Sequence, residues 1–306
     1  MKWHESRVVV TGGAGFIGGH LCESLLQKGA RVTVLDDLST GSFGNLEALG
    51  NRIEMVQCKL GDRQTSGVKL PPADVIFHLA GVADPRKCKE DFDLGFRANV
   101  LAVQDLLSAC TNEVRFIHMS SAAVYGDPDY VPIDENHPFK GNDPYAISKI
   151  LGEWVCKQHS LNSGVRLSII RPFNAFGPRQ SPGYLIPTLI RQAIQENKLE
   201  IWNADPIRDY LYVADAVEAL IAVAASERAV GMALNLGGGK GISAGTLASH
   251  IADLFNIPYS SLGKAVTGSA KLISDVTRIK ELTGWQPQIG FEEGIRRTID
   301  YFRTVV

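Results

Sequence analysis

The 306-residue sequence predicts an α/β fold, with a doubly wound parallel sheet in the first half and a smaller C-terminal α/β lobe built onto it. Short runs rich in β-branched residues alternate with stretches of helical length, the order that produces right-handed βαβ crossovers. The runs show little apolar–polar alternation, which is typical of parallel strands buried on both faces. The expected strands are residues 7–11, 31–35, 53–57, 75–79, 114–119 and 166–171.

The second half is divided by clusters of glycine and proline, above all at residues 177–183, and its elements are therefore shorter. We expect one domain formed by residues 1–171 with parts of 208–238. A second lobe would consist of residues 172–207 and 239–306, so that the two are interleaved in the sequence. The expected helices are residues 15–28, 92–109, 144–162, 185–196, 214–225, 244–255, 276–283 and 291–302.

The composition is that of an ordinary globular protein, with 45% hydrophobic and 21% charged residues. The net charge is -2 and basic residues do not cluster, so we expect neither nucleic acid nor a membrane surface as a partner. No apolar run reaches the roughly 18 residues of a membrane span. The five cysteines form no Cys-x-x-Cys pair, which fits a cytoplasmic protein, and the seven histidines lack the close spacing of a metal site.

A glycine-rich turn follows the first expected strand and opens a helix. Residues 11–18 read TGGAGFIG, in which the glycines allow a tight turn, close approach to a pyrophosphate and close packing of helix on strand. The helix N-terminus adds free N–H groups and a partial positive charge for the phosphates. The second strand leads to Asp36, 18 residues after Gly18, where a carboxylate accepts from the ribose hydroxyls and repels a 2′-phosphate. The pattern predicts a Rossmann-type domain that binds NAD rather than NADP.

Further candidates follow later strands, and each has a second interpretation. Asp62 comes after the third strand, where its carboxylate would meet the adenine amino group or cap a loop. Residues 78–81 (HLAG) are small enough to let a cofactor lie close, but they also suit the end of an apolar strand. Asn99 lies within an expected helix and could bond the backbone or face solvent.

Three residues suggest a catalytic group. The serine pair Ser120 and Ser121 closes the fifth strand, so its hydroxyls are expected at the carboxyl edge of the sheet, where ligands bind. Tyr145 and Lys149 are four residues apart and share one face of the next helix. A neighbouring ammonium, together with a nicotinamide charge, would pull the phenol pKa from about 10 toward neutrality. We therefore expect Tyr145 to act as the base, Ser121 to bond the same substrate oxygen, and Lys149 also to hold the cofactor ribose.

With these motifs the chain resembles the extended short-chain dehydrogenases/reductases of the NAD-dependent sugar epimerase/dehydratase family, and within it most resembles UDP-glucose 4-epimerases. The similarity covers nearly the whole length. It is carried by residues 11–18, 36–41, 61–62, 78–81, Asn99, 120–126, Tyr145, Lys149, 171–180, 208–210 and 284–287.

The resemblance implies NAD as cofactor and a nucleotide sugar, first of all a UDP-linked one, as substrate. The cofactor-binding residues that it implies are Gly12, Gly15, Phe16, Ile17, Gly18, Asp36, Asp37, Leu38, Ser39, Thr40, Gly41, Asp62, Arg63, Leu79, Ala80, Gly81, Asn99, Ser120, Tyr145, Lys149 and Pro172. The substrate-binding residues are Ser121, Ala122, Tyr145, Asn174, Arg179 and Arg208, with Asn174 and Arg208 at the diphosphate. A homodimer is also expected, because the helices at 92–109 and 144–162 are apolar on more than one face.

Two neighbouring positions bear on the reaction. The family's 4,6-dehydratases carry an Asp-Glu pair after the strand-end hydroxyl residue, and its decarboxylases usually carry a glutamate at the second place. Ala122 and Ala123 stand there and can exchange no proton, which favours epimerisation through a 4-keto sugar. The alternatives are a dehydratase, decarboxylase or reductase of a nucleotide sugar, or a non-catalytic NAD-sensing regulator. The family's Arg-Pro-Gly-Asp segment is missing, so Lys264 or Lys271 would have to replace its diphosphate-binding arginine.

Overall fold

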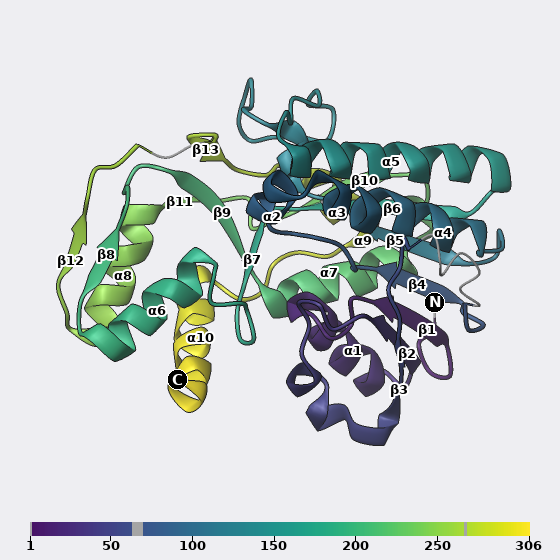
Figure 1. The fold of residues 1–306 in the computed structure, drawn as a ribbon, viewed down its shortest axis with the longest axis horizontal. Helices are drawn as coiled ribbons and strands as arrows, with labels where there is room; N and C mark the ends of the chain where they lie inside the picture. Colours follow the sequence, from purple (N-terminus) through teal and green to yellow (C-terminus); the bar gives the residue numbers. More distant parts are fainter. Residues whose placement is uncertain (1, 63–69, 266–267) are drawn as a thin grey trace.

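The computed structural model describes residues 2–62, 70–265 and 268–306. A seven-stranded parallel sheet forms the larger part of the molecule, in the order β10-β6-β5-β4-β1-β2-β3 (Figure 1). The strand order reverses between β1 and β4, which is where open α/β sheets bind their ligands. The strands are β1 (Arg7–Thr11), β2 (Arg31–Asp36), β3 (Ile53–Gln57), β4 (Val75–His78), β5 (Arg115–Met119), β6 (Arg166–Pro172) and β10 (Ala233–Leu236).

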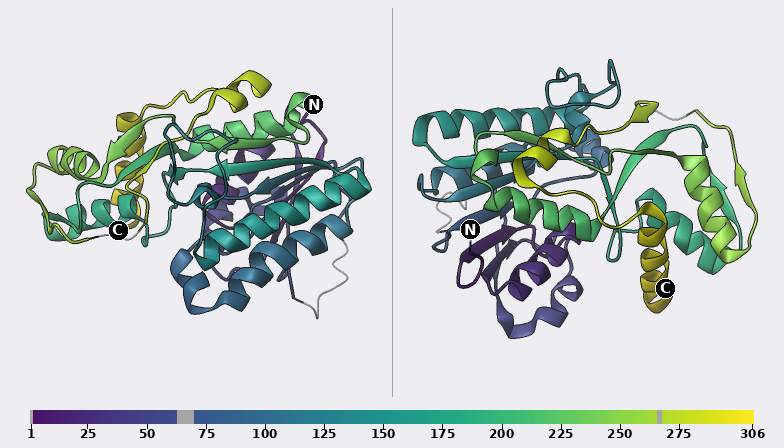
Figure 2. Two further views of the ribbon diagram at one scale, coloured as in Figure 1. Left: turned by 90° about the horizontal axis from the view of Figure 1, so that it is seen from above. Right: turned by 180° about the vertical axis from the view of Figure 1, so that it is seen from behind.

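Helices cover both faces of this sheet, which explains the uniformly apolar strands (Figure 2). Val8 and Val10 of β1 face one buried cluster, to which α1 (Phe16–Gln27) and α7 (Val213–Ala225) contribute. Val9, between them, faces the opposite cluster with α4 (Ala102–Ser108) and α5 (Pro144–Ser163). Because neighbouring side chains of a strand point to opposite faces, both must be apolar here. The predicted doubly wound parallel sheet is confirmed.

Most predicted elements are confirmed to within one or two residues, but the helix predicted at 92–109 is wrong as one continuous helix. It is divided into α3 (Phe92–Phe96), a π-helical turn (Arg97–Leu101) and α4. A short helix, α2 (Pro85–Glu90), precedes it and was not predicted. The π-helical turn carries the buried Asn99, whose side chain bonds groups outside the helix. Apolar periodicity alone does not reveal such an insertion, although π-turns often occur at functional sites.

The second lobe begins where the sheet ends. Strand β6 leads at once into β7 (Asn174–Phe176), and β10 leads into β11 (Gly241–Ser243), so the carboxyl edge of the sheet faces this lobe. Here β7, β9 (Ile207–Tyr212), β11 and β13 (Lys271–Leu272) form a four-stranded sheet, and β8 (Leu199–Ile201) pairs with β12 (Tyr259–Ser261). Three helices close a separate apolar core around them: α6 (Leu185–Glu196), α8 (Ala244–Phe255) and α10 (Phe291–Val305).

The boundary between the two parts differs from the predicted one near the C-terminus. Helix α9 (Thr277–Thr283) packs on α7 and β10, and Ile279 and Trp285 belong to the apolar cluster under the large sheet. Residues 277–285 therefore belong with the first domain, although 239–306 was assigned to the second lobe. The chain crosses between the parts several times, so sequence order could not show this.

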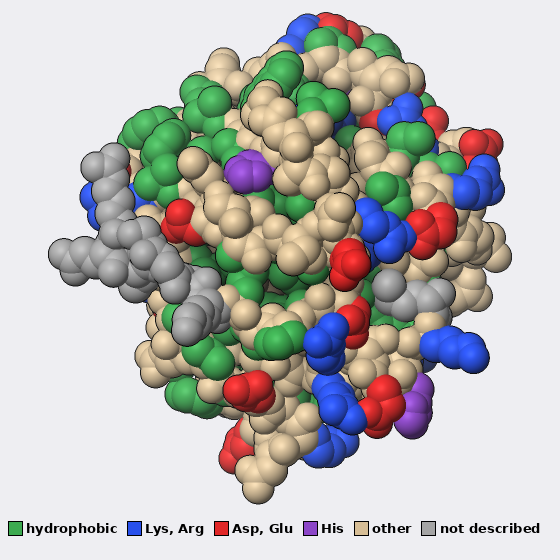
Figure 3. All heavy atoms as spheres, turned by 90° about the vertical axis from the view of Figure 1, so that its right-hand side faces the viewer, with side chains coloured by type: hydrophobic (Ala, Val, Ile, Leu, Met, Phe, Trp, Pro, Cys, Tyr) green, Lys and Arg blue, Asp and Glu red, His purple; other side chains and the backbone are tan. Residues whose placement is uncertain are grey.

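Acidic and basic side chains are interspersed on the face drawn in Figure 3. Within the three described segments, no helix combines the length and the apolar character that crossing a membrane requires.

Candidate active site

The glycine turn after β1 is held against the end of β4. Gly12 has a φ of +69°, and a Cβ there would lie 2.7 Å from the backbone nitrogen of Ala80. A Cβ on Gly18 would lie 2.7 Å from the Cα of Gly13. Both positions therefore require glycine for close backbone packing. Gly15 is the N-cap of α1 and has no side chain to bond the first N–H groups of the helix, so these stay available for phosphates.

Asp36 ends β2 beside this turn. Its buried carboxylate accepts from the backbone N–H groups of Ala14 (2.9 Å) and Leu38 (2.8 Å), which ties the glycine turn to the following loop. Asp37 accepts from the N–H and the hydroxyl of Ser39, which makes a tight turn at Leu38, where φ is +60°. The glycine turn and the loop after β2 thus form a cradle of fixed shape, with the carboxylate of Asp36 at its edge.

Other predicted cofactor contacts lie near the same carboxyl edge of the sheet, in both of its halves. Gly41 packs against Ala14, and Thr40 precedes it. Asp62 lies in the loop after β3, whereas Arg63 lies outside the described residues. Phe16 and Ile17 open α1, Leu79 follows β4 directly, and Pro172 is the last residue of β6.

Ser121, Tyr145 and Lys149 come together at the end of β5. Ser121 caps a short 3₁₀ turn (Ala122–Tyr125) by accepting from the N–H of Ala123 at 3.1 Å, and its hydroxyl lies near the phenol of Tyr145, whose pKa it lowers. Tyr145 lies in the first turn of α5 and is only 7% exposed. Lys149, one turn later, is buried and donates from Nζ to the carbonyl oxygen of Met119 at 3.2 Å. The spacing of the three residues in the sequence therefore corresponds to one cluster in space.

Burial dominates the electrostatics of this cluster. It raises the pKa of Tyr145 well above its usual range, and the neighbouring hydroxyl of Ser121 offsets this only in part. Burial also lowers the pKa of Lys149 to about 8, against the opposing effects of Cys88, Cys156 and Glu153. The expected lowering of the pKa of Tyr145 by Lys149 together with a nicotinamide charge stays a prediction, because it depends on the charge of a bound cofactor.

Asn99 holds the loop after β4 onto α5. Its Oδ1 accepts from the N–H of Val82 (3.0 Å), and its Nδ2 donates to the hydroxyl of Ser148 (2.9 Å). A Cβ on Gly81 would lie 2.5 Å from Asn99 Oδ1 and 3.4 Å from Lys149 Nζ. The small residue at 81 therefore lets Asn99 and Lys149 approach the end of β4.

The three other residues proposed to bind substrate, Asn174, Arg208 and Arg179, lie in two places. Asn174 of β7 donates to the carbonyl of Asp209 at 3.2 Å, and Arg208 lies on the adjacent strand β9, where burial lowers its pKa. Arg179 instead points to the first domain, where its guanidinium bonds Glu23 (3.2 Å) and the carbonyl of Asn45 (3.4 Å). The structure therefore groups Asn174 with Arg208 but binds Arg179 to α1 and its neighbouring loop.

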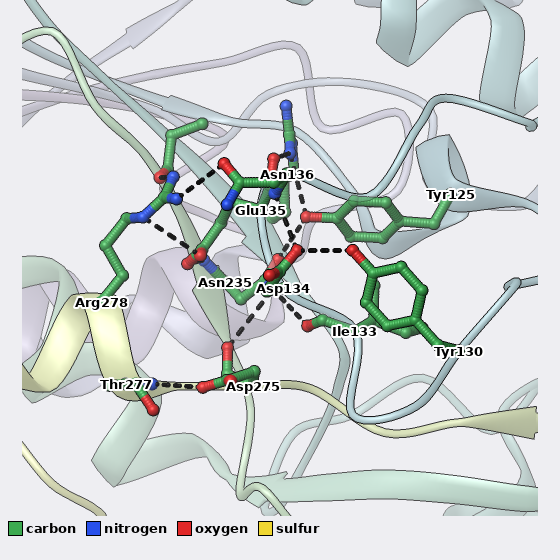
Figure 4. Close-up of polar contacts among 12 residues, drawn as sticks. Tyr125, Tyr130, Ile133, Asp134, Glu135, Asn136, Asn235, Asp275, Thr277 and Arg278 are labelled. Atoms are coloured by element: carbon green, nitrogen blue, oxygen red, sulfur yellow. Dashed lines mark hydrogen bonds and ion pairs between the residues drawn. The ribbon is translucent and has the colours of Figure 1, made fainter.

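A buried polar network lies behind the site and was not predicted. Tyr125 donates to Asn235 of β10 at 2.6 Å, and the backbone N–H of Asn235 donates to Glu135 at 2.7 Å (Figure 4). Glu135 also pairs with Arg278 of α9 at 3.3 Å. These contacts fix the loop between β5 and α5 to β10 and α9. No sequence spacing indicates them, because the partners come from four separate segments.

Another residue missed from the sequence is Glu153, which lies four residues after Lys149 on α5. It is fully buried and accepts from the hydroxyl of Ser120 at 2.7 Å. Ser120, which the resemblance assigns to the cofactor, therefore turns its side chain into the protein. The four-residue spacing along one helix face was the available signal.

Comparison with known proteins gives a consistent result. The profile of the NAD dependent epimerase/dehydratase family matches residues 8–237. A UDP-glucose 4-epimerase of Mycolicibacterium smegmatis is 32% identical, covering 97% of this chain and 98% of its own. A UDP-N-acetyl-α-D-glucosaminuronate decarboxylase of Bacillus cytotoxicus is 30% identical, covering 98% and 99%. The UDP-glucuronic acid 4-epimerase of Bacillus cereus, solved with UDP-glucuronic acid and NAD, is 26% identical with a TM-score of 0.89, covering 98% and 100%.

Proposed function

The chain belongs to the NAD-dependent epimerase/dehydratase family of nucleotide-sugar enzymes, and we propose that it is an epimerase that inverts the C4 hydroxyl of a UDP-hexose, with UDP-glucose and UDP-galactose as the first pair. One arrangement carries this proposal. Ser121 and Tyr145 lie together at the carboxyl edge of the sheet, with Lys149 one helical turn after Tyr145, while the two residues after Ser121 are Ala122 and Ala123. The site therefore offers one proton acceptor for a hydroxyl but no acid at these two positions to expel a leaving group.

The cradle fits the cofactor in shape and charge. Gly12, Gly15 and Gly18 would hold the pyrophosphate against the N-terminus of α1, and Asp36 would accept from the ribose hydroxyls. Bound there, the cofactor would supply a reversible hydride acceptor and the positive charge of an oxidised nicotinamide ring. Lys149 would hold the nicotinamide ribose from α5.

Tyr145 would take the proton of the C4 hydroxyl as that carbon is oxidised and give it back when the keto sugar is reduced on its other face. Ser121 would donate to the same oxygen and keep it in line with the phenol. Because burial raises the pKa of Tyr145, we propose that the phenolate forms only when positive charge is added by the bound ring, beside that of Lys149. Proton transfer would then be confined to the filled site.

Asn174 and Arg208 would bind the diphosphate from adjacent strands. Of the two lysines considered for the missing arginine, Lys264 lies over the ring of Trp202 at 5.5 Å. Lys271 lies on β13, which pairs directly with β9 beside Arg208. We therefore assign Lys271 the supporting role at the diphosphate.

The test is a product screen with purified protein. UDP-glucose, UDP-galactose, UDP-glucuronate and TDP-glucose are incubated separately, and the sugar products are identified by chromatography and NMR. The proposal predicts interconversion of the first two with no net consumption of added NAD. A pentose product from UDP-glucuronate would favour the decarboxylase alternative, which similarity to the Bacillus cytotoxicus enzyme keeps open. A 4-keto-6-deoxy product from TDP-glucose would instead indicate a dehydratase.

A further inference from the structure

The end of β5 is joined to α5 by two hydrogen bonds beside the reacting pair. The carbonyl oxygen of Met119 accepts from Lys149 at 3.2 Å, and the hydroxyl of Ser120 donates to Glu153 at 2.7 Å. The next residue, Ser121, lies near Tyr145. Tyr145, Lys149 and Glu153 follow one another at intervals of four residues, so they lie along one face of the helix.

The hydrogen bond of Ser120 depends on a carboxylate that is itself held in place. Oε1 of Glu153 accepts from Ser120 and also from Nε of Arg171 at 2.9 Å, and its Oε2 accepts from NH2 of the same guanidinium at 2.8 Å. Arg171 comes from β6, the strand beside β5 in the sheet. The Glu153 side chain is 0% exposed and that of Arg171 is 3% exposed. A buried bidentate pair of this kind has a restricted geometry, so Ser120 meets an acceptor at a defined position.

Arg171 is also restrained on its other side. It donates to the hydroxyl of Tyr125 at 2.9 Å, and its guanidinium lies 4.8 Å from the ring centre of Phe139. The carboxylate therefore cannot follow Ser120 if the strand end shifts. Any movement of this strand end breaks the hydrogen bond of Ser120 rather than displacing Glu153.

We propose that Glu153 is a positioning residue, which through the hydroxyl of Ser120 holds the end of β5 at the distance from α5 where Ser121 meets Tyr145. Ser121 is the next residue in the chain, so the anchor acts one peptide unit away from the reacting hydroxyl. The inference rests on the proposed function only in taking Ser121 and Tyr145 as reacting groups.

Ser120→Ala is the primary test, because it removes the link but leaves the Glu153–Arg171 pair intact. We expect kcat to fall by ~10- to 10²-fold with KM little changed, the effect of a small misplacement at the reacting centre. In a Ser121→Ala background, Ser120→Ala should lower kcat no further, because its effect on kcat passes through the hydroxyl of Ser121. Full kcat in folded Ser120→Ala, or additive losses in the double variant, would overturn the proposal.

Ser168→Ala is the matched control. Ser168 is also a fully buried serine, on β6, and bonds Arg115 at 2.7 Å and the carbonyl of Ala229. It should lose a similar amount of stability while kcat stays normal. An equal loss of kcat in both variants would mean that Ser120 contributes only general stability.

A measurement without substrate separates this inference from the proposed function. Amide hydrogen exchange in residues 119–125 should become faster in Ser120→Ala and stay unchanged in Ser168→Ala, even if no tested sugar nucleotide is converted. Unchanged exchange there would refute the positioning role. Glu153→Gln, which keeps an acceptor oxygen for Ser120, should retain more kcat than Glu153→Ala, and equal losses would count against the link.

Discussion

Tyr145→Phe is the most direct test of the chemistry. The ring is 7% exposed and packed at the start of α5, so phenylalanine keeps the packing and removes one oxygen, which lies near the hydroxyl of Ser121. Loss of a positioned base typically lowers the rate by ~10²–10⁴-fold, which corresponds to about 3–5 kcal/mol in the activation free energy. Removing the hydroxyl should lower the free energy of unfolding by no more than about 0.5–1.5 kcal/mol, the usual contribution of one hydrogen bond. The variant should therefore fold and bind, yet turn over very slowly.

The assay follows interconversion of UDP-glucose and UDP-galactose at saturating substrate, with affinity for the nucleotide sugar measured separately by calorimetry. Tyr212→Phe is the matched control, since Tyr212 is also 7% exposed and its ring lies 5.9 Å from the guanidinium of Arg297 in the second lobe. It should keep normal kcat. Near-normal turnover in Tyr145→Phe would place the base elsewhere and refute the roles given to Ser121 and Lys149 as well.

Three further predictions follow from the site and its surroundings. Asp36→Ala should lose much of the preference for NAD over NADP, because the charge that opposes a 2′-phosphate is gone. Titrations of the variant and the unsubstituted protein with both cofactors measure this preference. An unchanged ratio of the two dissociation constants would contradict the prediction. Burial lowers the pKa of Lys149 to about 8, from an ordinary value of 10.5. Between these two pH values the Lys149 amine binds more protons in the unfolded chain than in the folded one. The free energy of unfolding should therefore rise with pH in that window, by up to ~3 kcal/mol. Denaturant titrations across that pH range should show this rise in the free energy of unfolding for the unsubstituted protein but not for Lys149→Met. The same pH dependence in both proteins would contradict the prediction. Trp154 is 59% exposed on α5, with Ile147 and Leu151 also exposed on that helix, and we propose this face as the contact of a homodimer. Trp154→Glu should then shift the protein toward monomer in light scattering at micromolar concentration, and a monomer before substitution would refute the contact.

The local parts of the site could be predicted because each follows from short-range spacing. The glycine turn, Asp36 and the pair Tyr145 and Lys149 lie at fixed offsets from a strand end or along one helix turn. Backbone geometry carries such offsets directly into space. The parallel sheet was predictable for the same reason, since strands buried on both faces show no apolar–polar alternation.

Only the tertiary structure decided which distant segments are in contact and how burial affects the side chains of the site. The link from Ser120 through Glu153 to Arg171 joins two strands and a helix, and nothing in the sequence specifies which buried acid meets which buried base. The effect of burial on the pKa of Tyr145 was also not predictable, because a spacing shows that a lysine is near but not how much water is excluded. The sequence by itself therefore determined which groups come together at the end of β5, while side-chain packing decided how they are held and how burial shifts their pKa values.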